Sequence, residues 1–217
     1  MNKIEFHAVC PEIFVHRFAD AAGSDIWRKP FVSFTRGEKY LIECASGTGK
    51  SSLCSYIIGM RHDFRGHILF DGRDSASYSI ADWVELRTCH VSLMFQELRM
   101  FPELTALENV EIRNSLTHTL NSATITDWFE RLGLADKLNS PLGMMSFGQQ
   151  QRVAVIRALA SDFQFLFLDE PTSHLDDANS AAVAALVDEE ANKRNAAVIV
   201  TSIGRHPALN YNHVYSL

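Results

Sequence analysis

The sequence predicts an α/β protein whose sheet is largely parallel. Two apolar runs, residues 163–170 and 196–202, have the continuous hydrophobicity of strands that are buried on both faces. Segments with helical spacing precede them, at residues 149–160 and 180–194. Strands that alternate with helices in this way are typical of an α/β domain with a parallel core.

The N-terminal half contains a further strand, a helix and another strand. Residues 39–47, KYLIECASG, are an apolar strand that runs into a glycine-containing turn, and residues 50–60 then have helical spacing. Residues 66–74, GHILFDGRD, alternate like a strand and contain an Asp-Gly turn. These three elements are expected to follow one another along the chain.

Two shorter helices are expected in the middle of the chain. One opens at Ser79, which has with Asp82 the spacing of a capping box. The other covers residues 126–134, with its large apolar side chains on one side and a stop near Gly133. The helix-rich segment 100–156 is expected to form a separate lobe.

The composition is that of one globular unit. The chain has 217 residues, of which 47% are hydrophobic and 21% charged, and its net charge is −6. This acidic balance argues against a broad nucleic-acid surface, and no apolar run reaches the about 18 residues of a transmembrane helix. Four cysteines without C-x-x-C spacing indicate free thiols in a reducing compartment, so we expect a cytoplasmic protein. The nine histidines lack metal-ligand spacing, and we expect no structural metal.

The stretch CASGTGKS matches the phosphate-loop pattern G-x-x-x-x-G-K-[ST], except that Cys44 replaces the first glycine. Gly47 and Gly49 would let backbone N–H groups approach phosphates at a helix N-terminus. Lys50 would neutralise the β- and γ-phosphates, and the Ser51 hydroxyl would ligate Mg²⁺. The alternative is an ordinary glycine-containing turn. The candidate nucleotide-binding residues here are Cys44, Ala45, Ser46, Gly47, Thr48, Gly49, Lys50, Ser51 and Ser52.

Two adjacent carboxylates end the apolar strand at 163–170. A buried strand has no use for Asp169 and Glu170 unless its end opens into a site, because unpaired buried charges are costly. Asp169 can hold Mg²⁺, while Glu170 can polarise a water for attack on a γ-phosphate. The alternative, a strand that simply runs into solvent, is disfavoured by the phosphate loop upstream.

The stretch MSFGQQQR, residues 145–152, opens a helix shortly before these carboxylates. It resembles the L-S-G-G-Q signature of the ATP-binding-cassette (ABC) ATPases. Gln96 in LMFQE resembles the glutamine of the family's Q-loop, and residues 173–176 resemble its D-loop. The motifs occur in the family's order across nearly the whole chain. The stretch FPELTALENV, residues 101–110, is most similar to the lipoprotein-releasing and macrolide-export branch of the family.

The resemblance implies a P-loop NTPase core with a largely parallel sheet, a small antiparallel β subdomain and an inserted helical subdomain. It implies a single ABC ATPase domain over residues 1–217. Residues 1–99 and 157–217 would form the nucleotide-binding core with the β subdomain, and residues 100–156 the helical signature subdomain. The cofactors implied are ATP and Mg²⁺.

The resemblance also implies roles for individual residues. Gln96 would sense the γ-phosphate and the attacking water, and would join Ser51 and Asp169 around Mg²⁺. Phe18 is the best match for the aromatic side chain that stacks on adenine, with Phe14 second. The signature would bind the nucleotide held by a second subunit, through Ser146, Phe147, Gly148 and Gln149.

The chain departs from the family pattern at three positions. Cys44 and Phe147 replace glycines, which is acceptable where φ is negative. Ser202 stands where the family has a switch histidine, so we expect slow ATP hydrolysis with normal binding. His206 is either a displaced substitute or a surface-loop residue, and we favour the surface loop. For Cys44, beside Lys50 and a helix N-terminus, we expect a lowered thiol pKa and a reactive side chain.

Three functions are compatible with some of these features. The favoured one is the ATP-hydrolysing subunit of a complex that powers a membrane permease from the inner face of the cell membrane. As in the family, we expect this subunit to form a homodimer. The resemblance implies that the permease docks on residues 97–110, where Met100, Phe101, Leu104 and Leu107 would line a groove. The alternative is that these apolar residues only fill the helical lobe. The alternative is a soluble cassette acting on nucleic acid or ribosomes, but the chain lacks that class's coiled coils and basic extensions. A small-molecule kinase has no use for the signature, and we expect no direct nucleic-acid partner.

Overall fold

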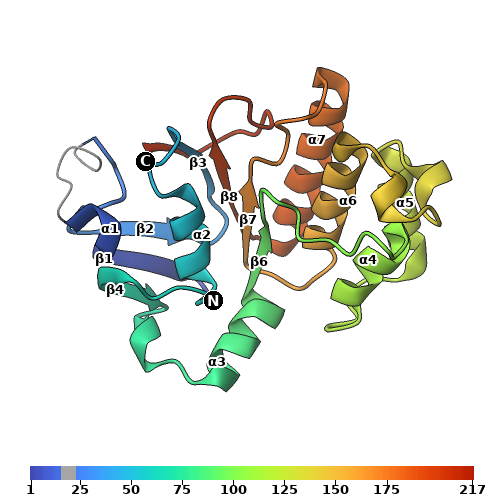
Figure 1. Ribbon diagram of the computed structural model, residues 1–217. Coiled ribbons are helices and arrows are strands. Elements are labelled where there is room, and N and C mark those ends of the chain that lie inside the picture. The colour runs from blue at the N-terminus through green and yellow to red at the C-terminus, as the bar shows by residue number, and fades with distance from the viewer. Residues whose placement is uncertain (16–22) are drawn as a thin grey trace.

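The computed structural model describes residues 1–15 and 23–217 (Figure 1). Within these residues five strands form a sheet in the order β6-β7-β8-β3-β9, and every neighbouring pair is parallel. The parallel sheet is thus confirmed, although β6 and β9 were not expected. The bounds of these strands are Lys39–Glu43 (β3), Val91–Met94 (β6), Phe165–Asp169 (β7), Ala197–Ser202 (β8) and His213–Ser216 (β9).

The central strands are apolar throughout because both faces of the sheet are covered. Phe165 and Phe167 of β7 lie in one hydrophobic cluster, which also contains residues of the second sheet. Leu166 and Leu168 lie in the other cluster, which contains the helices on the opposite face. Successive side chains of a strand point to opposite faces, so a sheet covered on both sides needs apolar residues at every position.

A second sheet is antiparallel and has the strand order β2-β1-β4-β5. Asp71 and Gly72 connect β4 to β5 with φ of 48° and 80°, so the expected Asp-Gly turn is confirmed. Helix α2 (Lys50–Ile57) shares one hydrophobic cluster with both sheets and so holds them together. The bounds of these strands are Lys3–Pro11 (β1), Val32–Thr35 (β2), Phe64–Phe70 (β4) and Arg73–Asp74 (β5).

Four helices lie on the far face of the parallel sheet (Figure 1). Their bounds are Ala106–Asn114 (α4), Ser122–Arg131 (α5), Phe147–Leu159 (α6) and Asp177–Arg194 (α7). The short helices α1 (Glu12–Val15) and α3 (Ile80–Glu85) lie near the antiparallel sheet (Figure 1). The capping box of Ser79 and Asp82 opens α3 as expected. Among the described residues, no helix combines the length and hydropathy needed to cross a membrane.

The segment 100–156 does not have a hydrophobic core of its own. Val110 of α4 and Trp128 of α5 belong to the same cluster as Leu166 and Val198 of the sheet. Helix α6 carries this continuity, since it runs through the proposed boundary at residue 156 to Leu159. The division into a nucleotide-binding core and a helical subdomain stays a prediction. The two parts share one continuous hydrophobic cluster.

Candidate nucleotide site

The site lies where three neighbouring parallel strands end. Glu43 at the end of β3 pairs in register with Ser202 of β8, and Asp169 of β7 pairs with Thr201 of β8. The carboxyl ends of parallel strands meet at one edge of the sheet, so the loops that follow them converge. The phosphate loop, the carboxylate pair and the segment after β8 are therefore neighbours.

The phosphate loop joins β3 to α2 in the geometry of an anion site. Gly47 and Gly49 have φ of 84° and 98°, which favours glycine at both positions. Gly49 is the N-cap of α2 and no side chain caps this helix start, so its N–H groups face the loop. Cys44 and Phe147 are not among the residues with positive φ, which explains why each position accepts a side chain.

Two buried aromatic residues support this loop from behind. The Trp27 indole Nε1–H donates to the Thr48 carbonyl oxygen at 2.8 Å. A Cβ atom at Gly49 would lie 3.0 Å from Phe14 and 3.1 Å from Trp27, so this position has no room for a side chain. Phe14, the second candidate for adenine stacking, is thus buried under the loop. The first candidate, Phe18, lies outside the described residues.

Sequence reasoning did not find Trp27. It stands 21 residues before the Thr48 carbonyl that it contacts. No motif spacing links the two residues, and the contact exists because the chain passes under the loop after leaving the antiparallel sheet.

The carboxylate pair and the phosphate-loop lysine form one buried cluster. The Lys50 Nζ atom lies 3.1 Å from Asp169 Oδ1 and 3.1 Å from Glu170 Oε1. It also donates to Gln96 Oε1 at 3.0 Å, which joins the Q-loop to the site. Burial alone would lower the pKa of Lys50, but the adjacent carboxylates outweigh it and raise that pKa. The lysine therefore carries its positive charge in the site.

Backbone and side-chain groups fix both carboxylates. The Thr201 hydroxyl donates to Asp169 Oδ1 at 2.6 Å, and the Ile203 N–H donates to Glu170 Oε1 at 2.7 Å. Glu170 has φ of 54°, a conformation that is uncommon outside glycine and is found at functional sites. The surrounding bonds hold this residue in its strained geometry.

Gln151 is a second site residue that sequence reasoning missed. Its Nε2 donates to the Glu170 carbonyl oxygen at 2.7 Å, and its Oε1 accepts from the His174 N–H at 3.3 Å. It thereby ties α6 to the segment after the carboxylate strand. The available signal was the helical phase of the QQQ run, because the third glutamine is the buried one.

The expected reactivity of Cys44 is wrong. The pKa of this thiol is raised to about 12, chiefly by burial; Lys50 lowers it, and Asp169 and Glu170 add to the rise. The side chain is 7% exposed and its Sγ lies 3.4 Å from the Ile42 carbonyl oxygen. The thiol therefore points back into the core, away from the mouth of the phosphate loop.

The signature residues form the N-terminus of α6. Ser146 is the N-cap, and its hydroxyl accepts from the Gln149 N–H at 3.3 Å while Gln149 Oε1 accepts from the Ser146 N–H at 2.9 Å. The Phe147 ring is 44% exposed and packs edge-on against His174, with ring centroids 4.5 Å apart. A Cβ at Gly148 would lie 3.0 Å from the His174 carbonyl oxygen, so this second glycine position is crowded.

Ser202 at the end of β8 and His206 in the loop that follows are the two candidates for the switch position. The Ser202 hydroxyl donates to the Arg205 carbonyl oxygen at 2.8 Å and accepts from the Gly204 N–H at 3.1 Å, so it closes a turn. His206 is exposed and packs against Tyr211, with ring centroids 5.5 Å apart. This is a surface-loop position for His206. The structure does not direct the Ser202 hydroxyl to the carboxylates, and its catalytic role stays a prediction.

The remaining loop residues differ in exposure. Ala45, Ser46, Gly47 and Ser51 are exposed, as a ligand-binding surface requires. Ser52 is buried, and its hydroxyl accepts from Arg61 Nη1 at 3.0 Å. The Ser52 side chain is therefore engaged by Arg61, and its role in nucleotide binding stays a prediction.

Comparison with known protein families finds a match that includes the segments of this site. A family model described as ABC transporter matches residues 30–173, which include the phosphate loop, Gln96, the signature and both carboxylates. The chain belongs to the ABC transporter family. It is an ATP-binding protein of the ABC ATPase class, as its motifs implied.

Two relatives belong to the branches that the sequence resembled. The lipoprotein-releasing system ATP-binding protein LolD of Alcanivorax borkumensis is 31% identical over 196 residues, which cover 89% of this chain and 86% of that protein. The macrolide export ATP-binding/permease protein MacB of Bartonella quintana is 34% identical over 173 residues. That match covers 78% of this chain and 26% of the longer relative.

A solved structure confirms the ABC cassette fold. The bacterial ABC transporter cassette MJ0796, in a dimeric structure, aligns with a TM-score of 0.74 and 22% identity. The alignment covers 93% of this chain and 88% of that chain. The two-sheet architecture with helices on the far face of the parallel sheet is therefore that of an ABC cassette.

Proposed function

We propose that this ABC ATPase binds ATP between two copies of the chain, hydrolyses it, and thereby powers a membrane permease at the cytoplasmic face of the cell membrane. The contact of Lys50 with Asp169, Glu170 and Gln96 carries the proposal. These contacts support the proposal because Lys50, a cation suited to phosphates, lies within 3.1 Å of a carboxylate suited to polarising water and of the Q-loop glutamine. Phosphate oxygens of ATP would compete with the carboxylates for Lys50 and leave Glu170 to polarise the attacking water.

Mg²⁺ fits the donors that this site offers. Ser51, Gln96 and Asp169 supply a hydroxyl, an amide and a carboxylate oxygen, and Mg²⁺ prefers oxygen ligands. Bound there with ATP, the ion would neutralise charge on the phosphates. The ends of α2 and β7 hold two of these residues on rigid elements, and the Q-loop brings the third.

Dimerisation is supported by the exposed apolar side chains around the signature. Met144 is 84% exposed and Phe147 is 44% exposed, directly beside the start of α6. Ser146, Gly148 and Gln149 surround the same helix N-terminus, which favours an anion. We propose that this surface binds the γ-phosphate of ATP held by the other copy.

The test replaces the catalytic carboxylate. Glu170→Gln should bind ATP normally but lose about 10²-fold or more in turnover, because an amide cannot accept a proton from water. With ATP and Mg²⁺ the variant should elute as a dimer in size-exclusion chromatography. Glu43→Gln removes an exposed carboxylate at the end of β3, on the same edge of the sheet; it is the matched control and should behave as the wild type. Wild-type turnover in Glu170→Gln would refute the assignment.

A further inference from the structure

His174 is an exposed histidine that lies against the signature. It follows the carboxylate strand, within the segment 173–176. Its ring packs edge-on against Phe147, with ring centroids 4.5 Å apart, and its carbonyl oxygen would lie 3.0 Å from a Cβ atom at Gly148. No other described histidine has a ring contact or a hydrogen bond with a signature residue. His174 and the start of α6 therefore belong to one surface.

The main chain of His174 is held in place from the nucleotide site. Its N–H donates to Gln151 Oε1 at 3.3 Å, and Gln151 Nε2 donates to the Glu170 carbonyl oxygen at 2.7 Å. Gln151 is 2% exposed, so both bonds lie in a region where water competes little and hydrogen bonds are strong. One buried amide therefore fixes the position of His174 relative to the carboxylate residue of the same copy.

The imidazole ring of His174 is oriented by Ser173. The Ser173 hydroxyl lies 2.9 Å from the imidazole Nδ1 and 3.2 Å from the Glu170 carbonyl oxygen, which already has a donor in Gln151. When the hydroxyl donates to Nδ1, the proton of the neutral ring is on Nε2, at the opposite side of the ring. Nε2 has no hydrogen bond or ion pair among the described residues. The structure thus presents an oriented N–H donor at an exposed position.

The carboxylates of one copy have no imidazole beside them in the described part of the chain. The Ser202 hydroxyl closes a turn, and the His206 ring packs against Tyr211. Neither side chain is bonded to Lys50 or to the carboxylate pair. An imidazole can therefore reach a nucleotide bound there only from another element or from the other copy.

The surface that carries His174 suits a phosphate group. The N-terminus of α6 has the positive end of the helix dipole, and Ser146 caps it. Backbone N–H groups and a hydroxyl donate hydrogen bonds but stay neutral. An imidazole beside them adds a donor that can also carry a positive charge. The same surface is the one proposed to meet the γ-phosphate held by the other copy.

We propose that His174 is a catalytic residue that acts in trans, with its Nε2 donating to the γ-phosphate of the ATP held by the other copy. This inference rests on the proposed function. Water attacks the γ-phosphorus, Glu170 of the copy that holds ATP takes a proton from the water, and the electrons of the broken P–O bond leave with ADP. His174 stabilises negative charge on the γ-phosphate oxygens and is unchanged by the reaction. Phe147 keeps the imidazole on the surface where the two copies meet.

ATP turnover is first compared between two histidine variants. His174→Phe keeps an aromatic ring against Phe147 but removes the N–H, so turnover should fall about 10²-fold, as is typical when one preorganised donor is lost. His62 is the matched control, because it is also exposed and packs edge-on against an aromatic ring, that of Trp83, with centroids 5.8 Å apart. His62→Phe should keep wild-type turnover, and thermal unfolding should show that both variants are folded. Wild-type turnover in His174→Phe overturns the proposal.

A binding measurement then separates a donor from a packing role. In the Glu170→Gln background, dimerisation is titrated with ATP and Mg²⁺ by size-exclusion chromatography. His174→Phe should raise the ATP concentration at half-maximal dimerisation about fivefold, the loss expected for one net hydrogen bond. His174→Gln keeps an N–H donor and should need less ATP than His174→Phe. If the two variants dimerise alike, the ring only packs against the signature and the proposal fails.

Mixed dimers test whether the histidine acts on the other copy. Wild-type chain is incubated with an excess of either Glu170→Gln or Glu170→Gln/His174→Phe, so that most wild-type copies pair with a variant copy. ATP and Mg²⁺ are then added, and the fast phase of phosphate release reports the wild-type carboxylate. Action in trans predicts a fast phase with the single variant and its loss with the double variant. A fast phase of equal size in both mixtures places the histidine in its own copy's site and refutes action in trans.

The outcomes separate this inference from the proposed function. If Glu170→Gln loses turnover and dimerises with ATP while the His174 variants match the wild type, the histidine role is wrong and the proposed function stands. If Glu170→Gln does not dimerise with ATP, both are overturned. Loss of the fast phase only when the excess copy lacks His174 supports both.

Discussion

Replacing Trp27 by Phe tests whether the phosphate loop is held from behind. The indole is 1% exposed and donates to the Thr48 carbonyl oxygen at 2.8 Å. Phenylalanine keeps an aromatic ring under Gly49 but removes the donor and part of the packing volume. The substitution therefore frees the loop at one end while the rest of the site stays intact.

The size of the effect follows from the lost contacts. The hydrogen bond contributes about 1 kcal/mol net, and incomplete filling of the site costs about 1 kcal/mol more. For a chain of this length about 2 kcal/mol lowers Tm by roughly 4–8 °C. Fixing the backbone of one loop residue again on binding costs about 1–2 kcal/mol. ATP affinity should therefore fall by roughly 5- to 30-fold.

The assay compares two Trp→Phe variants by thermal unfolding and by ATP titration. Trp83 is 9% exposed and packs against Tyr78 and Phe70 in the region of the antiparallel sheet. Trp83→Phe should lower Tm by a similar amount but leave the Kd for ATP within about twofold of wild type, because no loop contact is lost. If Trp27→Phe keeps the wild-type Kd, or if both variants weaken ATP equally, the indole does not position the loop.

Two further predictions concern the departures from the family pattern. Because burial raises the pKa of Cys44 to about 12, its thiol stays protonated at pH 8.5 in the folded protein. Its alkylation by iodoacetamide, followed by peptide mass spectrometry, should be far slower than after denaturation, and rapid labelling would contradict the buried geometry. Ser202→Ala should lower Tm by about 2–4 °C through loss of the turn. ATP turnover of Ser202→Ala then tests the predicted catalytic role, with His206→Ala as the control: a catalytic Ser202 should lose turnover while His206→Ala keeps it, and the reverse result would make His206 the switch residue.

The sequence alone was sufficient for elements whose signals are local. The apolar runs of β7 and β8 predicted buried strands because burial on both faces demands hydrophobicity at each position. The Asp-Gly turn and the capping box at Ser79 depend on neighbouring residues, and both are present. The phosphate loop could also be predicted from the sequence, since it needs glycines and a lysine in one continuous stretch.

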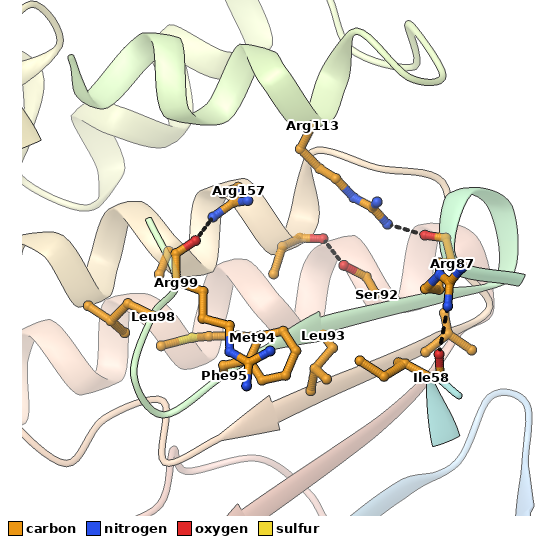
Figure 2. A pocket seen from close by; sticks show the side chains of 13 residues that line it. Ile58, Arg87, Ser92, Leu93, Met94, Phe95, Leu98, Arg99, Arg113 and Arg157 are labelled. Atoms are coloured by element: carbon orange, nitrogen blue, oxygen red, sulfur yellow. Dashed lines mark hydrogen bonds between the residues drawn. The ribbon is translucent and has the colours of Figure 1, made fainter. Parts of the chain in front are cut away.

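Only the tertiary structure decided how distant residues act on this site. Lys50 meets Gln96, 46 positions away, because the chain order and the spatial order of the parallel strands differ. The fold also buries Cys44. Desolvation therefore raises the pKa of its thiol more than the nearby Lys50 lowers it, whereas the sequence alone suggested that Lys50 would dominate. The cavity beside β6 is lined by side chains from β6, from the segments before and after it, and from α4 and α6, and no local sequence pattern marks it (Figure 2). Charge and burial depend on what the fold brings together, and these long-range neighbours are not encoded in residue spacing.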